Sequence, residues 1–255
     1  MAESWWRDFF DEEYMRIWAG FLPPERALKE GEGLWDVLGL KPGARVLDAP
    51  CGWGRLSQLM AERGAIVLGV DQSRTMIELA ERERGSLSSD QLQYRVHDLR
   101  EPLAETGFDA AYNVYSSIGY GTEADDRAIF TTLRHSVRPG GSVFVDTSHR
   151  DLAATFFARG GAHGNRLPDG TLVMEQPVFD AVEGRVNTTW YWSGPNGSGS
   201  RTASLRVYCA TELVRLMESV GLRFVSAHKG CSTEPFKATG ADMGGRIGIL
   251  ARRED

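Results

Sequence analysis

The chain has 255 residues, 42% of them hydrophobic and 25% charged, which is enough for one α/β domain with an elaboration or for two small domains. A formal net charge of -6, with no long Lys/Arg run, excludes nucleic acid as the expected partner. No apolar run approaches the ~18 residues of a membrane span, and the three cysteines lack disulfide or zinc spacing, so we expect a cytoplasmic protein without a membrane partner or a metal.

The N-terminal part of the chain has the pattern of a helical cap, residues 1–40. Over residues 5–19, aromatic and apolar side chains recur at spacings of three and four, which predicts an amphipathic helix. Residues 24–39 predict a second helix, because two prolines precede it and a glycine ends it.

Residues 41–150 alternate between short apolar strands and helical patterns. The expected helices are 54–64, 73–84 and 124–137, and the expected strands are 44–49, 65–70, 91–96, 108–114 and 142–147. Repetition of strand and helix predicts a parallel sheet that helices cover on both faces.

After residue 147 the pattern changes to period two. Residues 171–181, 185–192 and 200–208 predict an antiparallel meander of about three strands, placed as an insertion over residues 165–208 of a single domain that spans 1–255. A helix at 211–220 and strands at 222–230 and 244–253 predict that residues 209–255 complete the main sheet. We expect Glu175, Arg185 and Arg206 on these strands to be solvated unless the acceptor is ionic.

The segment "VLDAPCGWGR", Val46 to Arg55, joins an apolar strand to a helix through an aspartate and a Gly-x-Gly turn. This order is typical of nucleotide-binding loops, whose backbone N–H groups face phosphates. Pro50 removes one of these donors and keeps its carbonyl oxygen. The loop therefore favours a ligand with an ammonium group and no phosphate, such as S-adenosylmethionine.

A series of motifs over residues 44–150 resembles the class I, S-adenosylmethionine-dependent methyltransferases of the small-molecule type. It consists of "VLDAPCGWGRLSQLMAERGAIVLGVDQSRTMIELA", "VHDLRE", "FDAAYNVYSSIGY" and "LRHSVRPGGSVFVDT" in this order. The resemblance implies an α/β, Rossmann-like, seven-stranded and mostly parallel sheet, flanked by helices, with an N-terminal helical cap and an antiparallel β insertion after the fifth strand. It also implies a transferase that uses S-adenosyl-L-methionine and releases S-adenosyl-L-homocysteine.

The same resemblance implies the cofactor-binding residues. In the family, the acid that ends the first strand, here Asp48, lies under the methionine moiety, and the acid that ends the second, here Asp71, accepts hydrogen bonds from the ribose hydroxyls. Asp98 stands where the family places an acid near the adenine amino group. The full set is Asp48, Ala49, Pro50, Cys51, Gly52, Trp53, Gly54, Asp71, Gln72, Met76, His97, Asp98, Leu99 and Asn113.

Each of these residues also has a purely structural interpretation. Asp48 and Asp71 have the position of helix caps, and Met76 has that of a core residue on a helix. The ordered series with Asp98 favours the cofactor-binding interpretation.

We expect the acceptor pocket over the carboxyl ends of the parallel strands, where ligands of open α/β sheets bind. His149 follows the fifth strand there and is the candidate general base, with a loop hydrogen bond as its alternative role. Tyr14 is the second catalytic candidate. The expected substrate-binding residues are Tyr14, Trp18, Tyr115, Tyr120, His149, Trp192 and Tyr208.

The predicted function is methyl transfer to a small-molecule acceptor by in-line displacement, with N or O nucleophiles ahead of C. Two alternatives stay open. One is a protein of the same fold that binds the cofactor without methylating, which a pocket blocked by aromatic side chains would favour. The other is an NAD(P)-dependent dehydrogenase, which shares the strand, glycine loop and acidic strand end. We expect a monomer or a homodimer.

Overall fold

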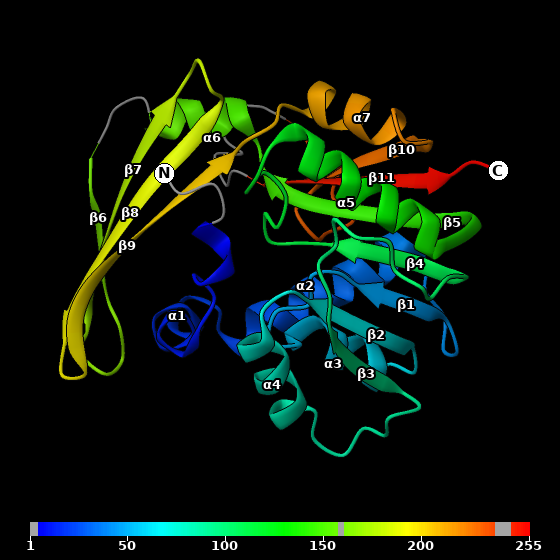
Figure 1. The fold of residues 1–255 in the computed structure, drawn as a ribbon, viewed down its shortest axis with the longest axis horizontal. Coiled ribbons are helices and arrows are strands. Elements are labelled where there is room, and N and C mark those ends of the chain that lie inside the picture. Colours follow the sequence, from blue (N-terminus) through cyan, green and yellow to red (C-terminus); the bar gives the residue numbers. More distant parts are fainter. Residues whose placement is uncertain (1–4, 158–160, 238–245) are drawn as a thin grey trace.

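The computed structural model describes residues 5–157, 161–237 and 246–255. In this part of the chain, a seven-stranded sheet and a four-stranded sheet stand side by side (Figure 1). The large sheet has the order β10 (Leu222–Lys229), β11 (Arg246–Arg253), β5 (Val137–Ser148), β4 (Phe108–Asn113), β1 (Arg45–Asp48), β2 (Ile66–Asp71) and β3 (Leu92–Val96).

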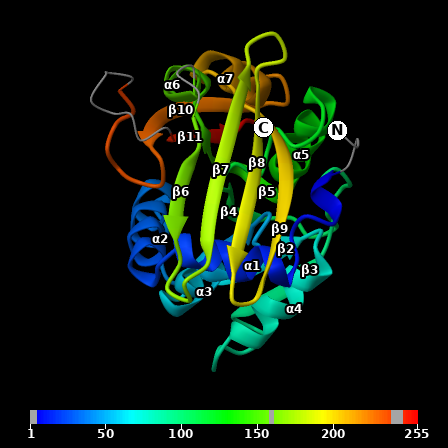
Figure 2. The same ribbon diagram turned by 90° about the vertical axis from the view of Figure 1, so that its left-hand side faces the viewer.

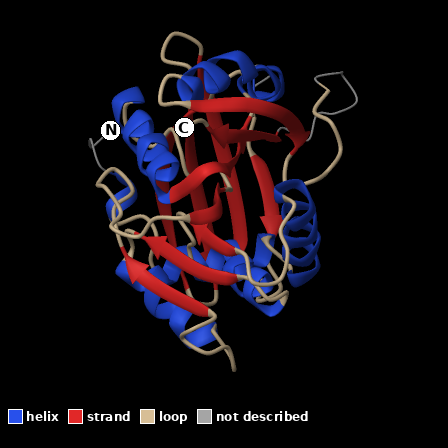
Figure 3. Ribbon diagram, turned by 90° about the vertical axis from the view of Figure 1, so that its right-hand side faces the viewer, coloured by secondary structure: helices blue, strands red, loops and turns tan. Residues whose placement is uncertain are grey.

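The large sheet is parallel from β1 to β5, and β11 runs antiparallel to both β5 and β10. The predicted Rossmann-like, mostly parallel seven-stranded sheet is therefore confirmed. Residues 244 and 245 of the predicted last strand lie outside the described residues. Figure 3 views this sheet from the side opposite the four-stranded sheet and shows helices on both of its faces.

Alternating side chains of the large sheet serve two separate cores. Val46 faces the core that contains α2 (Pro24–Leu38) and α3 (Arg55–Glu62). Its neighbour Leu47 faces the core that contains α5 (Glu123–Ser136) and α7 (Ala210–Glu218). Because successive side chains of a strand point to opposite faces, strands buried on both faces read as continuous apolar runs.

Local signals fix the ends of several helices. Helix α5 begins at a capping box, in which the Thr122 hydroxyl accepts the Asp125 N–H at 3.2 Å and the Asp125 carboxylate accepts the Thr122 N–H at 2.7 Å. Helix α4 (Arg74–Glu83) begins after Ser73, whose hydroxyl accepts the Met76 N–H at 3.3 Å. Such signals explain why the predicted ends of α3, α4 and α5 differ from the observed ends by no more than two residues.

The four-stranded sheet has the order β6 (His163–Arg166), β7 (Leu172–Asp180), β8 (Arg185–Gly194) and β9 (Gly197–Arg206), and all of its pairs are antiparallel. It follows β5 and α6 (Arg150–Phe157) in the chain. The sequence predicted about three of these strands and missed β6. Residues 163–166 are polar and exposed, so they carry no period-two apolar signal.

The N-terminal segment lies between the two sheets, as Figures 1 and 2 show. The single helix predicted over residues 5–19 is wrong in detail: a 3₁₀ turn η1 (Trp5–Arg7), helix α1 (Glu12–Trp18) and a second 3₁₀ turn η2 (Ala19–Phe21) replace it. Asp11 caps α1 by accepting the Tyr14 N–H at 2.8 Å, which ends the preceding segment. None of the described helices has the length and apolar character needed to cross a membrane.

Candidate functional site

A cleft opens at the carboxyl ends of β1, β2 and β4, beneath the N-terminal segment. Its empty volume is about 1130 Å³, counting space that is open to solvent. In Figure 1 the arrowheads of β4 and β5 point toward the four-stranded sheet, so this edge of the large sheet faces the insertion. The sequence placed the site at this edge, where open parallel sheets bind ligands.

Asp71 and Gly52 are joined by a hydrogen bond, although they come from different strand ends. The Asp71 carboxylate accepts the Gly52 N–H at 3.0 Å and the Ser73 N–H at 2.8 Å. Burial raises the pKa of Asp71 to about 6, while both backbone N–H groups lower it. A Cβ atom on Gly52 would meet nothing within 4 Å, so a ligand has room to approach the loop backbone closely.

Asp48 lies at the end of β1 and lines the same cleft, with 1% of its surface exposed. The Ser57 hydroxyl donates a hydrogen bond to its carboxylate at 2.5 Å. Burial raises the pKa of Asp48 to about 7, because removal from water disfavours the charged form. The cleft therefore contains two buried carboxyl groups that a bound cation would stabilise in the charged form.

Asp98, which lies just after β3, is held by Arg100 of the same loop. The Arg100 guanidinium donates from Nε to Asp98 Oδ1 at 3.0 Å and from Nη2 to Oδ2 at 2.5 Å. This hydrogen bonding lowers the pKa of Asp98. Arg100 also lies over the ring of Trp6, 5.7 Å from its centroid. Both carboxylate oxygens thus already accept from a guanidinium, which the sequence did not indicate.

Aromatic rings of the N-terminal segment form the outer wall of the cleft. Phe10 contacts Tyr14 and Tyr120 with ring centroids 5.0 and 5.8 Å apart. The Ser73 hydroxyl, beside the end of β2, donates to the Phe10 carbonyl oxygen at 2.8 Å. Burial raises the pKa of Tyr14 well above its ordinary value, so this phenol stays protonated at neutral pH.

Arg55 and Tyr115 face each other across the cleft near the glycine loop. The Arg55 guanidinium lies 5.1 Å from the centroid of the Tyr115 ring and donates from Nη1 to Glu30 at 2.6 Å. With 14% of its side chain exposed, Arg55 is the cation that follows the loop directly in the sequence. This residue was missed by the sequence analysis, although its place after Gly54 was a signal.

The structure brings most of the predicted cofactor-binding residues into the lining of the cleft. Three do not line it: Ala49 is fully buried, a Cβ on Gly54 would meet Tyr94, and Asn113 is buried behind Val114. The Asn113 Nδ2 group donates to the Ala49 carbonyl oxygen at 2.8 Å. The predicted residues that line it are Asp48, Pro50, Cys51, Gly52, Trp53, Asp71, Gln72, Met76, His97, Asp98 and Leu99.

Of the predicted substrate-binding residues, only Tyr14, Tyr115 and Tyr120 line the cleft. Trp18 and Trp192 pack instead in a small core under the four-stranded sheet, together with Ile17. Their placement in the acceptor pocket is not supported by the structure. A strand alternates its faces, so the sequence could not tell that Trp192 on β8 packs into this small core.

His149 and Tyr208 pair through an isolated β bridge outside the cleft lining. His149 is 3% exposed, its Nε2 accepts the Ala210 N–H at 3.3 Å, and burial lowers its pKa. The Tyr208 hydroxyl donates to Asp126, which itself lines the cleft, at 2.5 Å. The loop hydrogen bond considered as the alternative for His149 is the interaction present, and its role as a base stays a prediction.

Several lining residues were not predicted. Leu22 and the aromatic side chains of Trp6 and Phe10 come from the N-terminal segment, whose amphipathic pattern was the available signal. The others lie at the start of α3, in the loops after β3 and β4, and on α5: Arg55, Leu56, Arg100, Val114, Ser117, Gly121, Asp125, Asp126 and Ile129. Among the described residues, no group of three or more His, Cys, Asp or Glu side chains is arranged to hold a metal ion.

Residues 46–141 match the protein family described as "Methyltransferase domain". A ubiquinone biosynthesis O-methyltransferase of Xylella fastidiosa (strain 9a5c) is 37% identical over 132 residues, which are 51% of this chain and 52% of that protein. The chain therefore spans about half the length of the curated relatives it matches. The matched family segment contains the glycine loop and the strand ends that line the cleft.

Solved structures resemble the chain over nearly its whole length. An S-adenosylmethionine-dependent methyltransferase from Clostridium acetobutylicum superposes with a TM-score of 0.78 at 13% identity, covering 95% of this chain and 98% of that one. CalS10, an amino pentose methyltransferase from Micromonospora echinaspora whose structure contains S-adenosylmethionine, gives a TM-score of 0.70 at 18% identity, covering 95% and 97%. At these identities the likeness shows a shared fold.

Proposed function

We propose that this chain, whose core belongs to the class I S-adenosylmethionine-dependent methyltransferases, transfers the methyl group of S-adenosylmethionine to a small-molecule acceptor through an N or O nucleophile. The observation that carries the proposal is the hydrogen-bonded pair of Asp71 and Gly52 at the base of an open cleft. It joins an acidic strand end to a glycine loop, the two features to which the family resemblance assigns the ribose and the methionine moiety.

The charges of the cleft fit a cationic cofactor. Asp48 and Asp71 are buried with pKa values raised to about 7 and 6, so each gains from a positive charge nearby. When bound, S-adenosylmethionine supplies an activated methyl group on a sulfonium.

The one carboxylate of the cofactor also has a candidate partner. Arg55 is next to the glycine loop, lines the cleft, and uses only Nη1 for its contact with Glu30 among the described residues. Its remaining N–H groups are suited to a carboxylate, which a guanidinium binds with charge-assisted hydrogen bonds. We assign Arg55 to hold the methionine carboxylate.

The phenols of the cleft favour an acceptor that needs no strong base. Burial raises the pKa values of Tyr14, Tyr115 and Tyr120, so these groups donate hydrogen bonds and orient an acceptor without taking its proton. An amine that binds as its free base already carries the lone pair for in-line attack. The protein then acts mainly by holding the nucleophile and the methyl group at attack distance, which can supply a large part of the reduction in activation free energy.

The four-stranded sheet supports the loop that carries Tyr120. From β8, the Arg185 guanidinium donates to the carbonyl oxygens of Gly119, Tyr120 and Gly121 at 3.0, 2.9 and 3.1 Å. The expectation of a solvated Arg185 is therefore wrong. Because the insertion holds a wall of the cleft, we propose that all described elements work as one domain and that the insertion shapes acceptor recognition.

A cofactor-binding protein without methyl transfer would be favoured by a cleft filled with aromatic side chains. The aromatic rings here line a cleft that stays open to solvent, so the geometry does not favour this alternative over methyl transfer.

Calorimetric titration with S-adenosylmethionine and S-adenosylhomocysteine, with NADH and NADPH as controls, tests the cofactor. We expect micromolar binding of the first pair only. Tritium-labelled S-adenosylmethionine and a panel of small amines and hydroxyl compounds then test transfer, with an N- or O-methylated product expected. Binding of a nicotinamide alone would overturn the proposal, as would the absence of any labelled product from a protein that binds the cofactor.

A further inference from the structure

Two consecutive residues after β4 have left-handed backbone conformations. Tyr115 has a φ angle of 71° and Ser116 one of 60°. Side chains other than glycine adopt this region rarely, because the Cβ atom is crowded there. Such conformations persist only where the surroundings hold them in place, and they gather at functional sites.

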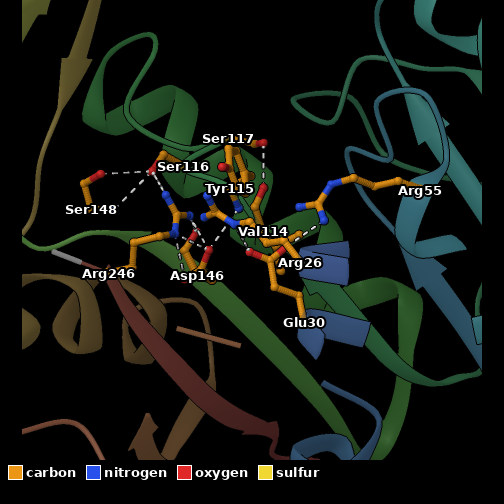
Figure 4. Close-up of polar contacts among 10 residues, drawn as sticks. All are labelled: Arg26, Glu30, Arg55, Val114, Tyr115, Ser116, Ser117, Asp146, Ser148 and Arg246. Carbon is orange, nitrogen blue, oxygen red and sulfur yellow. Dashed lines mark hydrogen bonds and ion pairs between the residues drawn. The ribbon is translucent and has the colours of Figure 1, made fainter. Parts of the chain in front are cut away.

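Asp146, near the end of β5, holds the backbone of this turn. Its Oδ1 accepts the Tyr115 N–H at 3.1 Å and its backbone oxygen accepts the Ser116 N–H at 3.0 Å. The Ser116 hydroxyl in turn accepts the Ser148 N–H at 3.1 Å. Both amide groups of the left-handed pair therefore depend on one residue, as Figure 4 shows.

Arg246, the first residue of β11, holds Asp146. Its Nε donates to the two carboxylate oxygens at 2.9 and 3.2 Å, and its Nη2 pairs with the same carboxylate. Its Nη1 donates to the Ser116 hydroxyl at 3.1 Å. The ion pair is largely removed from water, with 2% of the Asp146 side chain and 21% of the Arg246 side chain exposed. A pair in this setting holds a fixed geometry.

The turn carries a wall of the cleft. Val114, Tyr115 and Ser117 line the cleft, whereas Asp146 and Arg246 do not. The Arg246 guanidinium lies over the Tyr115 ring, 4.7 Å from its centroid. Figure 4 shows the ring among this guanidinium and those of Arg26 and Arg55. The orientation of Tyr115 thus depends on its backbone conformation and on Arg246 together.

We propose that Asp146 and Arg246 are positioning residues, which keep the Tyr115–Ser116 turn left-handed and so fix the wall of the cofactor cleft without touching the ligand. Loss of the Asp146 charge or of the Arg246 guanidinium breaks the ion pair that holds the Oδ1 acceptor of the Tyr115 N–H in place, while the Ser116 N–H keeps its bond to the Asp146 backbone oxygen. The turn then relaxes to an unstrained conformation, which takes the Tyr115 ring out of the wall. The inference rests on the proposed function, because its first test measures the affinity for S-adenosylhomocysteine. Its second test, amide hydrogen exchange in the turn, needs no ligand.

The test measures S-adenosylhomocysteine affinity by calorimetry for the wild type, D146N and R246M, well below the unfolding temperature of each. We expect about tenfold to a hundredfold weaker binding for both variants. The matched control is R253M. Arg253 lies on the same strand, and its guanidinium donates to the carbonyl oxygens of Arg134, His135 and Val137, remote from the cleft. We expect R253M to lose thermal stability and keep its affinity.

A second substitution distinguishes a change in the conformation of the turn from a general loss of stability. Glycine adopts left-handed conformations without a Cβ penalty, so Ser116→Gly added to D146N should recover part of the affinity, by about threefold or more. Amide hydrogen exchange of Tyr115 and Ser116, measured without ligand, should be faster in D146N and R246M than in R253M.

Wild-type affinity in folded D146N and R246M would overturn the positioning role, as would an equal loss in R253M. Failure of the wild type to bind S-adenosylhomocysteine would overturn the proposed function. In that case hydrogen exchange alone tests whether Asp146 and Arg246 hold the turn. Unchanged exchange in the two variants refutes this role, and faster exchange confined to the turn supports it.

Discussion

The Arg201 guanidinium on β9 binds the Asp11 carboxylate through two hydrogen bonds of 2.8 and 2.6 Å, across 190 positions of sequence. Arg201 also donates to the Phe9 carbonyl oxygen at 2.7 Å. Asp11 caps α1, which carries Tyr14 into the cleft. One side chain of the four-stranded sheet therefore holds the aromatic segment that covers the cleft.

Replacing Arg201 with methionine should loosen this segment. We expect S-adenosylhomocysteine to dissociate about threefold to thirtyfold faster, since binding differences between related variants are expressed mainly in dissociation rates. Stopped-flow fluorescence would measure the rate. Arg223→Met on β10, which removes an exposed ion pair with Glu254, is the control and should leave the rate unchanged. Equal rates in all three proteins would show that the segment does not retain the ligand.

Cofactor binding should release protons near neutral pH. The pKa of Asp48 is raised to about 7 in the folded protein by burial, and a bound cation favours the ionised form. Affinity for S-adenosylmethionine should therefore rise with pH through about 7. Calorimetry in buffers of different ionisation enthalpy would count the protons released, and Asp48→Asn should remove most of the effect. A pH-independent affinity would exclude Asp48 from the cation site.

The same carboxyl group makes the apo protein less stable at high pH. Because the folded pKa of Asp48 lies above its ordinary value of 3.8, the folded state binds the extra proton between these values, and stability falls as pH rises from about 4 to 7. Asp48→Asn should thus raise the unfolding free energy at pH 8 by about 2–4 kcal/mol and have little effect at pH 4. Denaturant titrations at both pH values would measure the difference, and a destabilising effect at pH 8 would contradict it.

Arg55→Met should discriminate between two ligands that differ in the amino-acid moiety. We expect S-adenosylhomocysteine to bind about tenfold or more weakly, whereas 5′-methylthioadenosine, which lacks the carboxylate, should bind as in the wild type. Calorimetry provides both affinities. Arg26→Met is a matched control, since Arg26 contacts the same Glu30 and the same Tyr115 ring but does not line the cleft. A parallel loss for both ligands would remove Arg55 from the carboxylate site.

His149→Ala should destabilise the protein and leave cofactor affinity intact. The imidazole is buried and accepts the Ala210 N–H, so its loss should cost about 1–3 kcal/mol of unfolding free energy. Once an acceptor is known, kcat per folded molecule distinguishes the two roles. An unchanged kcat supports the structural role, and a large decrease with normal stability would support the predicted base.

Most of the predicted cofactor-binding residues line the cleft, because they follow strand ends in order. Each acid or glycine there is adjacent to an apolar strand, and parallel strands bring their carboxyl ends to one edge of the sheet. Asp48, Gly52 and Asp71 accordingly line one cleft. Asp98 lines the cleft as well, but its pairing with Arg100 was not predicted, because local sequence does not report side-chain geometry.

Fewer of the predicted substrate-binding residues line the cleft, because they come from segments with period-two or irregular patterns. Tyr14 and Tyr120 line the cleft, whereas His149 and Trp192 lie in other packing environments. The guide to these residues was that their segments were expected to reach the carboxyl edge of the sheet. A one-residue shift in a strand or turn reverses the direction of a side chain, so such proximity does not determine which residues reach a ligand.

By itself the sequence determined the parallel sheet, its two covered faces and the order of acidic residues and glycines along one edge, because these depend on local periodicity and on short-range connection rules. Only the tertiary structure decided how Arg185 and Arg201 of the second sheet hold the cleft and how Arg246 and Asp146 hold the Tyr115 turn. These contacts join residues that are 31 to 190 positions apart, and their formation depends on the packing of whole sheets rather than on any local signal.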